Sequence, residues 1–288
     1  MKFSDINIRD PFVLVHDGKY YLYGTRAENT WEEKPLETLG FDVYESDDFE
    51  NWSEPKQIFG YYDGFWGKTQ YWAPEVHYYK GKFYLFATFA GSDSHRGTAI
   101  MVCDTPNGTF KEHSQGAVTP KDWECLDGTF YVEDETPYIV FCHEWTQIKD
   151  GEVCALELTN DLKSSVGKPK LLWKASEPDW RYDIRDNGSY VTDGPFLVKA
   201  DKELLCLWSS FSRGEYVQAI SYSDNGKLFG KWTISENLIY EKDGGHGMYF
   251  TDLKGENYFI FHYPNETPKE RPTTKKITID ELKKKALG

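Results

Sequence analysis

Three aspartates that precede proline or glycine are the first candidates for chemistry in this chain. Asp10 begins an Asp-Pro pair, and Asp127 and Asp193 each begin an Asp-Gly pair. Taken singly, each dipeptide is an ordinary turn in which the aspartate caps its own backbone. Carboxyl groups that meet in one site can instead act as a general acid and a general base, the pair that cleavage of a glycosidic bond requires. The chemistry therefore depends on whether the fold brings them together.

An internal repeat places these dipeptides at corresponding positions. Five segments begin with one residue followed by proline or glycine, and each continues as a strand, a tight turn and a second, more apolar strand. The segments are RDPFVLVHDGKYYLYGT, WAPEVHYYKGKFYLFAT, LDGTFYVEDETPYIVFCH, TDGPFLVKADKELLCLWSS and GGHGMYFTDLKGENYFIFHY. Their opening residues, 53 to 66 positions apart, are Asp10, Ala73, Asp127, Asp193 and His246.

The repeat predicts the fold. A second, weaker pattern of strand and polar turn lies between these hairpins, so each period holds two hairpins and four strands. Five such units predict an all-β, five-bladed β-propeller. We expect a single domain over residues 1–288, with a short C-terminal tail after about residue 272. Helical periodicity occurs only in ITIDELKKKAL near the end of the chain, where Asp280 can start a short helix.

The propeller turns the repeat into a prediction about chemistry. The first strand of each blade lines the central channel, so we expect Asp10, Asp127, Asp193 and His246 to face one axis. Like charges in a narrow, desolvated channel are unfavourable, and packing alone gives no reason to accept that cost. A catalytic pocket does: two carboxyls act on the substrate, and the third raises the pKa of the acid, which then keeps its proton near neutral pH.

Residues near these positions are the candidates for binding. Trp72 directly precedes Ala73 and is placed to stack on a sugar face, although a tryptophan more often belongs to the core. Glu144, in CHEW, is a second candidate acid, a hydrogen-bonding residue for substrate, or a solvated strand end. Arg271 is expected at the pocket rim as a substrate-binding cation, or in a surface ion pair. His246 is a core histidine or the ligand of an ion.

Composition excludes several classes of protein. The 288 residues include 33 basic and 47 acidic side chains, a net charge of −14 that disfavours nucleic acid as a partner. No stretch approaches the roughly 20 apolar residues of a membrane helix. Five cysteines without a CxxC motif indicate reduced core residues. The opening MKFSDINIRDPF lacks the apolar segment of a secretory signal, so we expect a cytoplasmic location.

The five motifs, in this order and at blade spacing, resemble glycoside hydrolase family 43. The resemblance rests on RDPF with DGKYYLYGT, YWAPEVHYYKGKFYLFAT, the Asp-led third copy, DGPFLVK and GGHGMYF, and it extends from about residue 6 to about residue 272. It implies a five-bladed propeller that hydrolyses α-L-arabinofuranosides or β-D-xylosides in small oligosaccharides with inversion. No cofactor is implied as a requirement.

The resemblance also assigns roles. Asp10 becomes the general base that activates water, and Asp127 the carboxylate that tunes and orients the acid. The usual acid is a glutamate in Glu-Gly-Pro, where this chain has Asp193, one methylene shorter; we predict Asp193 as the acid, with Glu144 as the alternative. In an inverting enzyme the two working carboxyls lie about 6.5–9.5 Å apart. His246 matches a position where a structural calcium or other ion is held through waters in the channel.

Other functions stay open at this point. Because Asp193 is shorter than the usual glutamate acid, a non-catalytic carbohydrate-binding propeller is an alternative. A metal-dependent propeller hydrolase, such as a lactonase, would need several carboxylate or asparagine ligands around one ion. A protein-interaction propeller is disfavoured because the repeats lack the Trp-Asp and Gly-His signatures. The residues do not specify the sugar, the anomer, the linkage, exo or endo action, or the oligomeric state.

Overall fold

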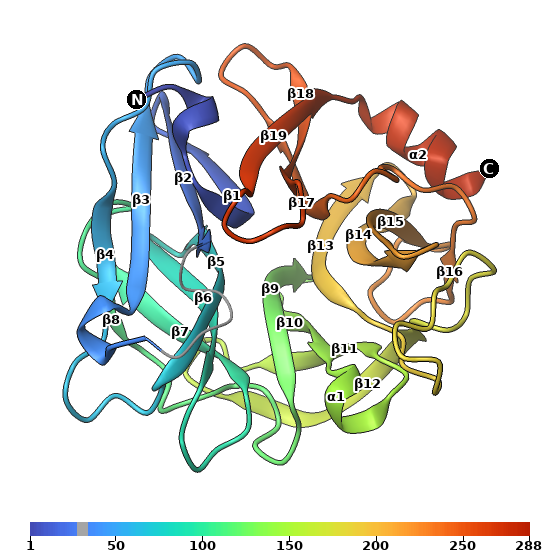
Figure 1. The fold of residues 1–288 in the computed structure, drawn as a ribbon, viewed down its shortest axis with the longest axis horizontal. Helices are drawn as coiled ribbons and strands as arrows, with labels where there is room; N and C mark the ends of the chain where they lie inside the picture. Colours follow the sequence, from blue (N-terminus) through green and yellow to red (C-terminus); the bar gives the residue numbers. More distant parts are fainter. Residues whose placement is uncertain (28–33) are drawn as a thin grey trace.

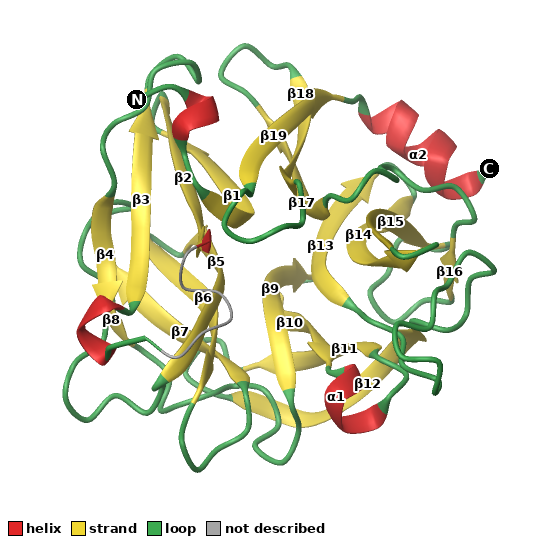
Figure 2. Ribbon diagram, in the orientation of Figure 1, coloured by secondary structure: helices red, strands yellow, loops and turns green. Residues whose placement is uncertain are grey.

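Five antiparallel sheets follow one another around a ring in the computed structural model, which describes residues 1–27 and 34–288 (Figure 1). Every sheet is built from strands that are consecutive in sequence, so the colour in Figure 1 runs once around the ring from blue to red. Strands dominate, and the helices are short (Figure 2). The prediction of an all-β, five-bladed propeller is confirmed.

The first four blades each contain four strands. Blade 1 consists of β1 (Ile8–His16), β2 (Lys19–Arg26), β3 (Gly40–Ser46) and β4 (Lys56–Gly60). Blade 2 consists of β5 (Thr69–Tyr79), β6 (Lys82–Ala90), β7 (Gly97–Cys103) and β8 (Lys111–Glu112). Blade 3 consists of β9 (Cys125–Glu133), β10 (Thr136–His143), β11 (Glu152–Leu158) and β12 (Ser165–Lys174). Blade 4 consists of β13 (Asp193–Ala200), β14 (Glu203–Ser212), β15 (Glu215–Ser223) and β16 (Trp232–Ile234).

Blade 5 departs from the four-strand prediction. Its described strands are three: β17 (Gly245–Thr251), β18 (Asn257–Tyr263) and β19 (Arg271–Lys276). The chain then forms helix α2 (Ile279–Leu287), which begins with a capping box between Thr278 and Glu281. Leu282 and Ala286 are buried in an apolar cluster with residues of β13, β14 and β15 of blade 4 and of β18 of blade 5. The expected tail after about residue 272 is therefore a strand of blade 5 followed by a docked helix, which confirms the short helix expected near Asp280.

The other helical segments given for the described residues are single turns: η1 (Phe3–Asp5), η3 (Leu36–Thr38) and α1 (Trp145–Ile148). No helix within the described residues has the length and apolar character needed to span a membrane. The five cysteines are free, and four of them are buried, as expected for small core residues.

Side chains, not shared strands, close the ring between blades 5 and 1. In the described part of the chain no strand pairs across this boundary. Met248, Phe250 and Ile260 of blade 5 instead belong to the same apolar cluster as the core of blades 1 and 2. The Asn7 amide adds hydrogen bonds to the carbonyl oxygens of Pro268 (2.9 Å) and Glu270 (2.7 Å). Closure is therefore concentrated around the start of β1, where the first predicted aspartate lies.

A β-bulge interrupts the first strand of every blade at the same place. The first residue of each bulge has a left-handed φ between 46° and 55°. We call these five residues the axial ring: Asp10, Ala73, Asp127, Gly194 and His246. We call the residues one position earlier the cavity ring: Arg9, Trp72, Leu126, Asp193 and Gly245.

The rings correct one part of the sequence alignment. The repeat placed Asp193 in register with Asp10 and Asp127, but the bulge register places Gly194 there and Asp193 in the cavity ring. The physical reason lies in blade 5. A Cβ on Gly194 would stand 2.5 Å from the imidazole ring of His246, which occupies that space. Blade 4 therefore contributes its carboxyl from the neighbouring position.

Candidate active site

A cavity of about 560 Å³ adjoins the two rings and is lined by residues from all five blades. This volume is typical of a site for a small molecule. Six of the seven residues that the sequence analysis singled out line it: Asp10, Trp72, Asp127, Glu144, Asp193 and His246. The three aspartates thus meet in one cavity, although up to 183 positions separate them in the chain.

Asp10 lies at the axis and is almost completely buried. One carboxylate oxygen accepts a hydrogen bond from the Thr25 hydroxyl (2.6 Å), and the other lies 3.2 Å from Nδ1 of His246. Burial alone would raise the pKa of Asp10, but His246, Arg9, His262 and the Thr25 hydroxyl together outweigh it and hold the pKa below its usual value. Asp10 is therefore ionised at neutral pH and can accept a proton.

A buried ion pair supports this aspartate from the boundary between blades 1 and 5. Nη1 of Arg9 donates to Oε1 of Glu270 (2.8 Å), and Nε of Arg9 lies 3.9 Å from Asp10. Glu270 is fully buried and also accepts a hydrogen bond from the Thr267 hydroxyl (2.6 Å). The pair keeps a positive charge beside the base while its own partner carboxylate stays out of the cavity lining.

Two neutral histidines complete the surroundings of Asp10. Burial lowers the pKa of both imidazoles, and that of His262 falls to about 3. Nδ1 of His262 accepts the backbone N–H of Asp10 (3.3 Å), so its proton is on Nε2, which lies 3.2 Å from Oδ1 of Asn265. Nδ1 of His246 faces both Asp10 and Asp127, at 3.2 and 3.7 Å. A neutral His246 can therefore donate one hydrogen bond between the two carboxyls.

Asp127 and Asp193 have the opposite protonation preference. Burial, then the charges of Asp193 and Asp10, raise the pKa of Asp127 well above its usual value, although its Oδ2 accepts the Gly194 N–H (3.0 Å). Burial, then the charge of Glu144, raise the pKa of Asp193 to about 7. The site thus holds an ionised carboxylate on blade 1 and a protonated carboxyl among the groups of blades 3 and 4.

Glu144 is placed to support this arrangement more than to replace Asp193. It caps helix α1 by accepting hydrogen bonds from the backbone and hydroxyl of Thr146. Its Oε2 also lies 3.6 Å from Nη1 of Arg96, whose guanidinium lies 5.2 Å from the centre of the Trp72 ring. The Glu144 carboxyl is thus occupied by a cation and by two donors of helix α1. This geometry favours Asp193 over Glu144 as the acid.

Arg271 is the one predicted site residue that the structure does not bring to the cavity. Its Nη1 donates to the carbonyl oxygens of Glu270 (2.8 Å) and Pro268 (3.5 Å), so it braces the loop before β19 and forms neither the predicted rim contact nor a surface ion pair in the described structure. Several polar residues that line the cavity were not predicted from the sequence, among them Arg9, Arg96, Tyr216 and Asn265. Only Arg9 had a signal, because it belongs to the RDPF motif.

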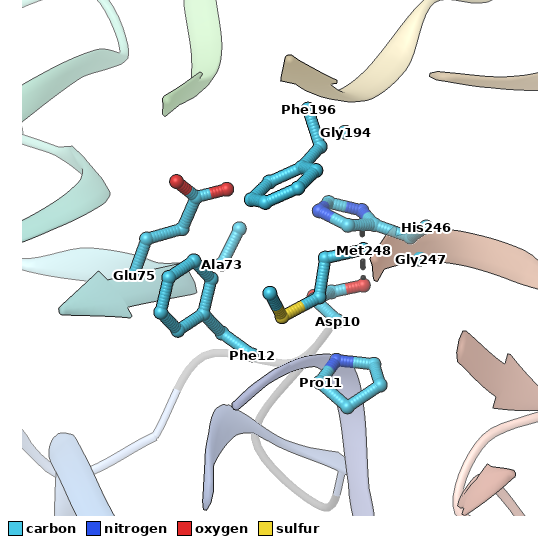
Figure 3. Close-up of a pocket in the computed structure, with 10 residues that line it drawn as sticks. All are labelled: Asp10, Pro11, Phe12, Ala73, Glu75, Gly194, Phe196, His246, Gly247 and Met248. Carbon is cyan, nitrogen blue, oxygen red and sulfur yellow. Dashed lines mark ion pairs between the residues drawn. The ribbon is translucent and has the colours of Figure 1, made fainter. Parts of the chain in front are cut away.

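The surroundings of His246 do not fit a directly coordinated calcium ion. Beyond the imidazole lies a space of only about 10 Å³, whose lining includes two carboxyl side chains, Asp10 and Glu75, and the apolar Phe12, Phe196 and Met248 (Figure 3). Among the described residues, no group of three or more His, Cys, Asp or Glu side chains is arranged to hold a metal. Calcium takes six to eight oxygen ligands. An ion held through waters stays a prediction, and no step below depends on it.

Comparison with known proteins agrees with this geometry. Residues 4–288 match the family model described as glycosyl hydrolases family 43. The crystal structure of an endo-arabinase from Bacteroides thetaiotaomicron VPI-5482 superimposes with a TM-score of 0.88 at 38% identity, over 96% of each chain. A thermostable family-43 glycoside hydrolase gives a TM-score of 0.80 at 25% identity, over 94% of this chain and 90% of the other.

Curated sequences give a more distant match. This chain is 24% identical over 209 residues to the extracellular endo-α-(1→5)-L-arabinanase 1 of Bacillus subtilis (strain 168), covering 68% of this chain. It is 22% identical over 217 residues to the arabinan endo-1,5-α-L-arabinosidase A of Aspergillus aculeatus, covering 71% of this chain. The matches span 60% and 58% of the lengths of these two relatives.

Proposed function

This chain belongs to glycosyl hydrolases family 43, and from that premise we propose that it hydrolyses α-L-arabinofuranosyl bonds in short oligosaccharides by an inverting general acid/base mechanism. The observation that supports this most directly is the pairing of opposite protonation states in one cavity. Asp10 is held ionised by its neighbours, while Asp193, whose pKa is raised to about 7, keeps its proton in acid and up to near-neutral pH. Two carboxyls that differ in this way can serve as base and acid at the same pH.

The proposed step follows from these states. Asp10 takes a proton from a water molecule as the water oxygen attacks the anomeric carbon. Asp193 gives its proton to the glycosidic oxygen, which also receives the electron pair of the breaking carbon–oxygen bond. Asp127 stays between them, linked to the base through His246 and to the acid's backbone through the Gly194 N–H. The negative charge thus passes from Asp10 to Asp193 without leaving the site.

The relatives suggest the sugar. Three of the four named above are described as an endo-arabinase, an endo-α-(1→5)-L-arabinanase and an arabinan endo-1,5-α-L-arabinosidase. We therefore propose α-1,5-linked arabino-oligosaccharides as the substrate class, ahead of β-D-xylosides. Trp72 and Trp145, both in the cavity wall, offer faces on which a sugar ring can stack.

A substrate panel tests the proposal. The protein is incubated with α-1,5-arabino-oligosaccharides, a 4-nitrophenyl α-L-arabinofuranoside and a 4-nitrophenyl β-D-xyloside, and released sugar is measured. We expect release from the arabinose substrates, with the first product in the inverted anomeric form by proton NMR, and loss of release in Asp10→Asn. Release from the xyloside alone would contradict the substrate, and retained configuration would contradict the mechanism.

A non-catalytic carbohydrate-binding propeller is the second candidate, and the shortened side chain of Asp193 favours it. A shorter acid holds its proton farther from the leaving oxygen unless its surroundings compensate. That function predicts saturable binding of the arabino-oligosaccharides by calorimetry, with no sugar released from any member of the panel.

A further inference from the structure

Tyr216 connects the candidate acid to the candidate base, although it belongs to neither ring. It lies on β15 with 2% of its surface exposed, and its hydroxyl donates to Oδ2 of Asp193 at 3.0 Å. Its ring stacks on His262 with centroids 5.6 Å apart and planes 18° apart. His262 in turn accepts the backbone N–H of Asp10. One aromatic pair therefore contacts both working aspartates.

The backbone leaves a place for this tyrosine. Gly245 holds the cavity-ring position of blade 5, and a Cβ there would stand 3.0 Å from the Tyr216 ring and 2.6 Å from the Ser209 hydroxyl. The Tyr216 ring thus fills the space that a blade 5 side chain would take. Phe211 also packs against the Tyr216 ring in an edge contact, with ring centroids 5.2 Å apart and planes 61° apart. A buried phenol that contacts both His262 and Phe211 has little freedom to move its hydroxyl.

Asp193 needs a hydrogen-bond partner of this kind because its side chain is one methylene shorter than that of the usual glutamate acid. An aspartate carboxyl can rotate about its own axis, and Tyr216 donates the hydrogen bond that the described structure gives this carboxyl. With Oδ2 held, Oδ1 is the oxygen left to bear the proton that goes to the leaving group. Without the hydrogen bond from Tyr216, the short side chain of Asp193 would present its proton in several orientations, of which few point toward the glycosidic oxygen.

We propose that Tyr216 is the positioning residue that compensates for the missing methylene of Asp193, by holding Oδ2 so that the proton on Oδ1 faces the leaving oxygen. The proposal rests on the proposed function and adds a residue to its mechanism. The transferred proton moves from Oδ1 to the glycosidic oxygen as the bond from that oxygen to the anomeric carbon breaks and its electron pair stays on the oxygen. Tyr216 keeps its own proton throughout.

Four proteins test this: wild type, Tyr216→Phe, Asp193→Glu and the double variant. Each is assayed on a 4-nitrophenyl arabinofuranoside, whose leaving group needs little protonation, and on arabinobiose, whose leaving group needs much. We expect Tyr216→Phe to lower kcat on arabinobiose about 10- to 100-fold and on the nitrophenyl substrate less than about 3-fold, since acid catalysis matters only for the poor leaving group. In the Asp193→Glu background, the loss on arabinobiose should shrink to about 3-fold or less.

Tyr23→Phe is the matched control, because it also removes one buried phenol hydroxyl, which donates to the carbonyl oxygen of Pro106 at 2.8 Å. It should lower the melting temperature without any dependence on the leaving group. Equal losses on both substrates for Tyr216→Phe, or equal losses in both Asp193 backgrounds, would mean that the tyrosine only packs, and the proposal would fall. A wild type that releases no sugar from either substrate would overturn the proposed function itself, and this inference with it.

Discussion

The two rings around the channel differ by one residue in sequence and by much more in environment. The axial ring places a carboxylate oxygen of Asp10 and one of Asp127 within 3.7 Å of the same atom, Nδ1 of His246. The cavity ring places Arg9, Trp72, Leu126 and Asp193 in the cavity wall. The candidate base comes from the first ring and the candidate acid from the second. The two carboxyls keep different protonation states because their neighbours differ, and not because of the ring alone, since Asp127 shares the axial ring with Asp10 and has a raised pKa.

The comparison also shows how each ring tolerates a glycine. Gly194 in the axial ring leaves room for the imidazole of His246, and Gly245 in the cavity ring leaves room for the ring of Tyr216. In both cases an aromatic group from an adjacent blade occupies the place of the missing side chain. The fivefold repeat is therefore broken where blades 4 and 5 meet, and it is at that boundary that the acid is held.

The largest expected effect is the loss of kcat when Asp10 of the axial ring is replaced. Asp10→Asn keeps the shape of the side chain but removes the group that accepts the proton from water. We expect kcat on arabino-oligosaccharides to fall about 10³-fold, within the range for loss of a general base. Circular dichroism and the melting temperature should match wild type. Hydrolysis within tenfold of wild type would reject Asp10 as the base.

The second effect is the loss of stability when a side chain is added in the space that Gly194 leaves for His246. Gly194→Ala combines a left-handed φ of 51° with a Cβ 2.5 Å from His246, so we expect a loss of about 3 kcal/mol in the free energy of unfolding. Gly255→Ala is the control, since Gly255 has a φ of 79° but no atom within 4 Å of the new Cβ. It should cost only about 1 kcal/mol, the backbone part alone. If urea titrations gave the same loss in the free energy of unfolding for Gly194→Ala and Gly255→Ala, the His246 ring would be shown to move aside at little cost.

The third effect is the pH dependence of kcat/KM, which distinguishes Asp10 of the axial ring from Asp193 of the cavity ring. Asp10 must be ionised, and its lowered pKa keeps it so until the pH falls below the usual aspartate range. Asp193 must be protonated, so kcat/KM should fall about tenfold for each pH unit above about 7. Glu144→Gln removes a charge that raises the pKa of Asp193 and should move the basic limb to lower pH. A basic limb that does not move would place the titrating group elsewhere.

The smallest effect concerns stability. The pKa of Asp193 is raised in the folded protein, so the ionised carboxylate is disfavoured there, and its contribution to stability declines as the pH rises from about 4 through about 7. Asp193→Asn removes that ionisation while it keeps an oxygen for the Tyr216 hydroxyl. We expect a gain of about 1 kcal/mol at pH 8, or roughly 2–4 °C in melting temperature, and a smaller gain at pH 5. No gain at pH 8 would argue that Asp193 is solvated.

The amino-acid sequence predicted a good part of the candidate site because the blades are local structures. Hairpins, turns and opening dipeptides depend on residues within about 20 positions, so the five copies and the three aspartates were visible without coordinates. Arg96, Tyr216 and Asn265 were not, since they lie outside the repeated motifs and reach the cavity only through the packing of neighbouring blades. Arg271, in contrast, lies in a motif-like stretch but bonds to its own loop.

Local pattern alone therefore determined the number of blades, the all-β class and the three acidic residues that face a common channel. Only the folded ring decided that Asp193 and not Gly194 carries the carboxyl toward the cavity, and which aspartate keeps a proton. Both outcomes depend on groups more than 20 positions away: the His246 imidazole, which fills the space beside Gly194 and lies beside Asp10, and the charge of Glu144, which raises the pKa of Asp193. Steric exclusion and electrostatic interaction act through space, and the sequence does not state which distant groups will be neighbours.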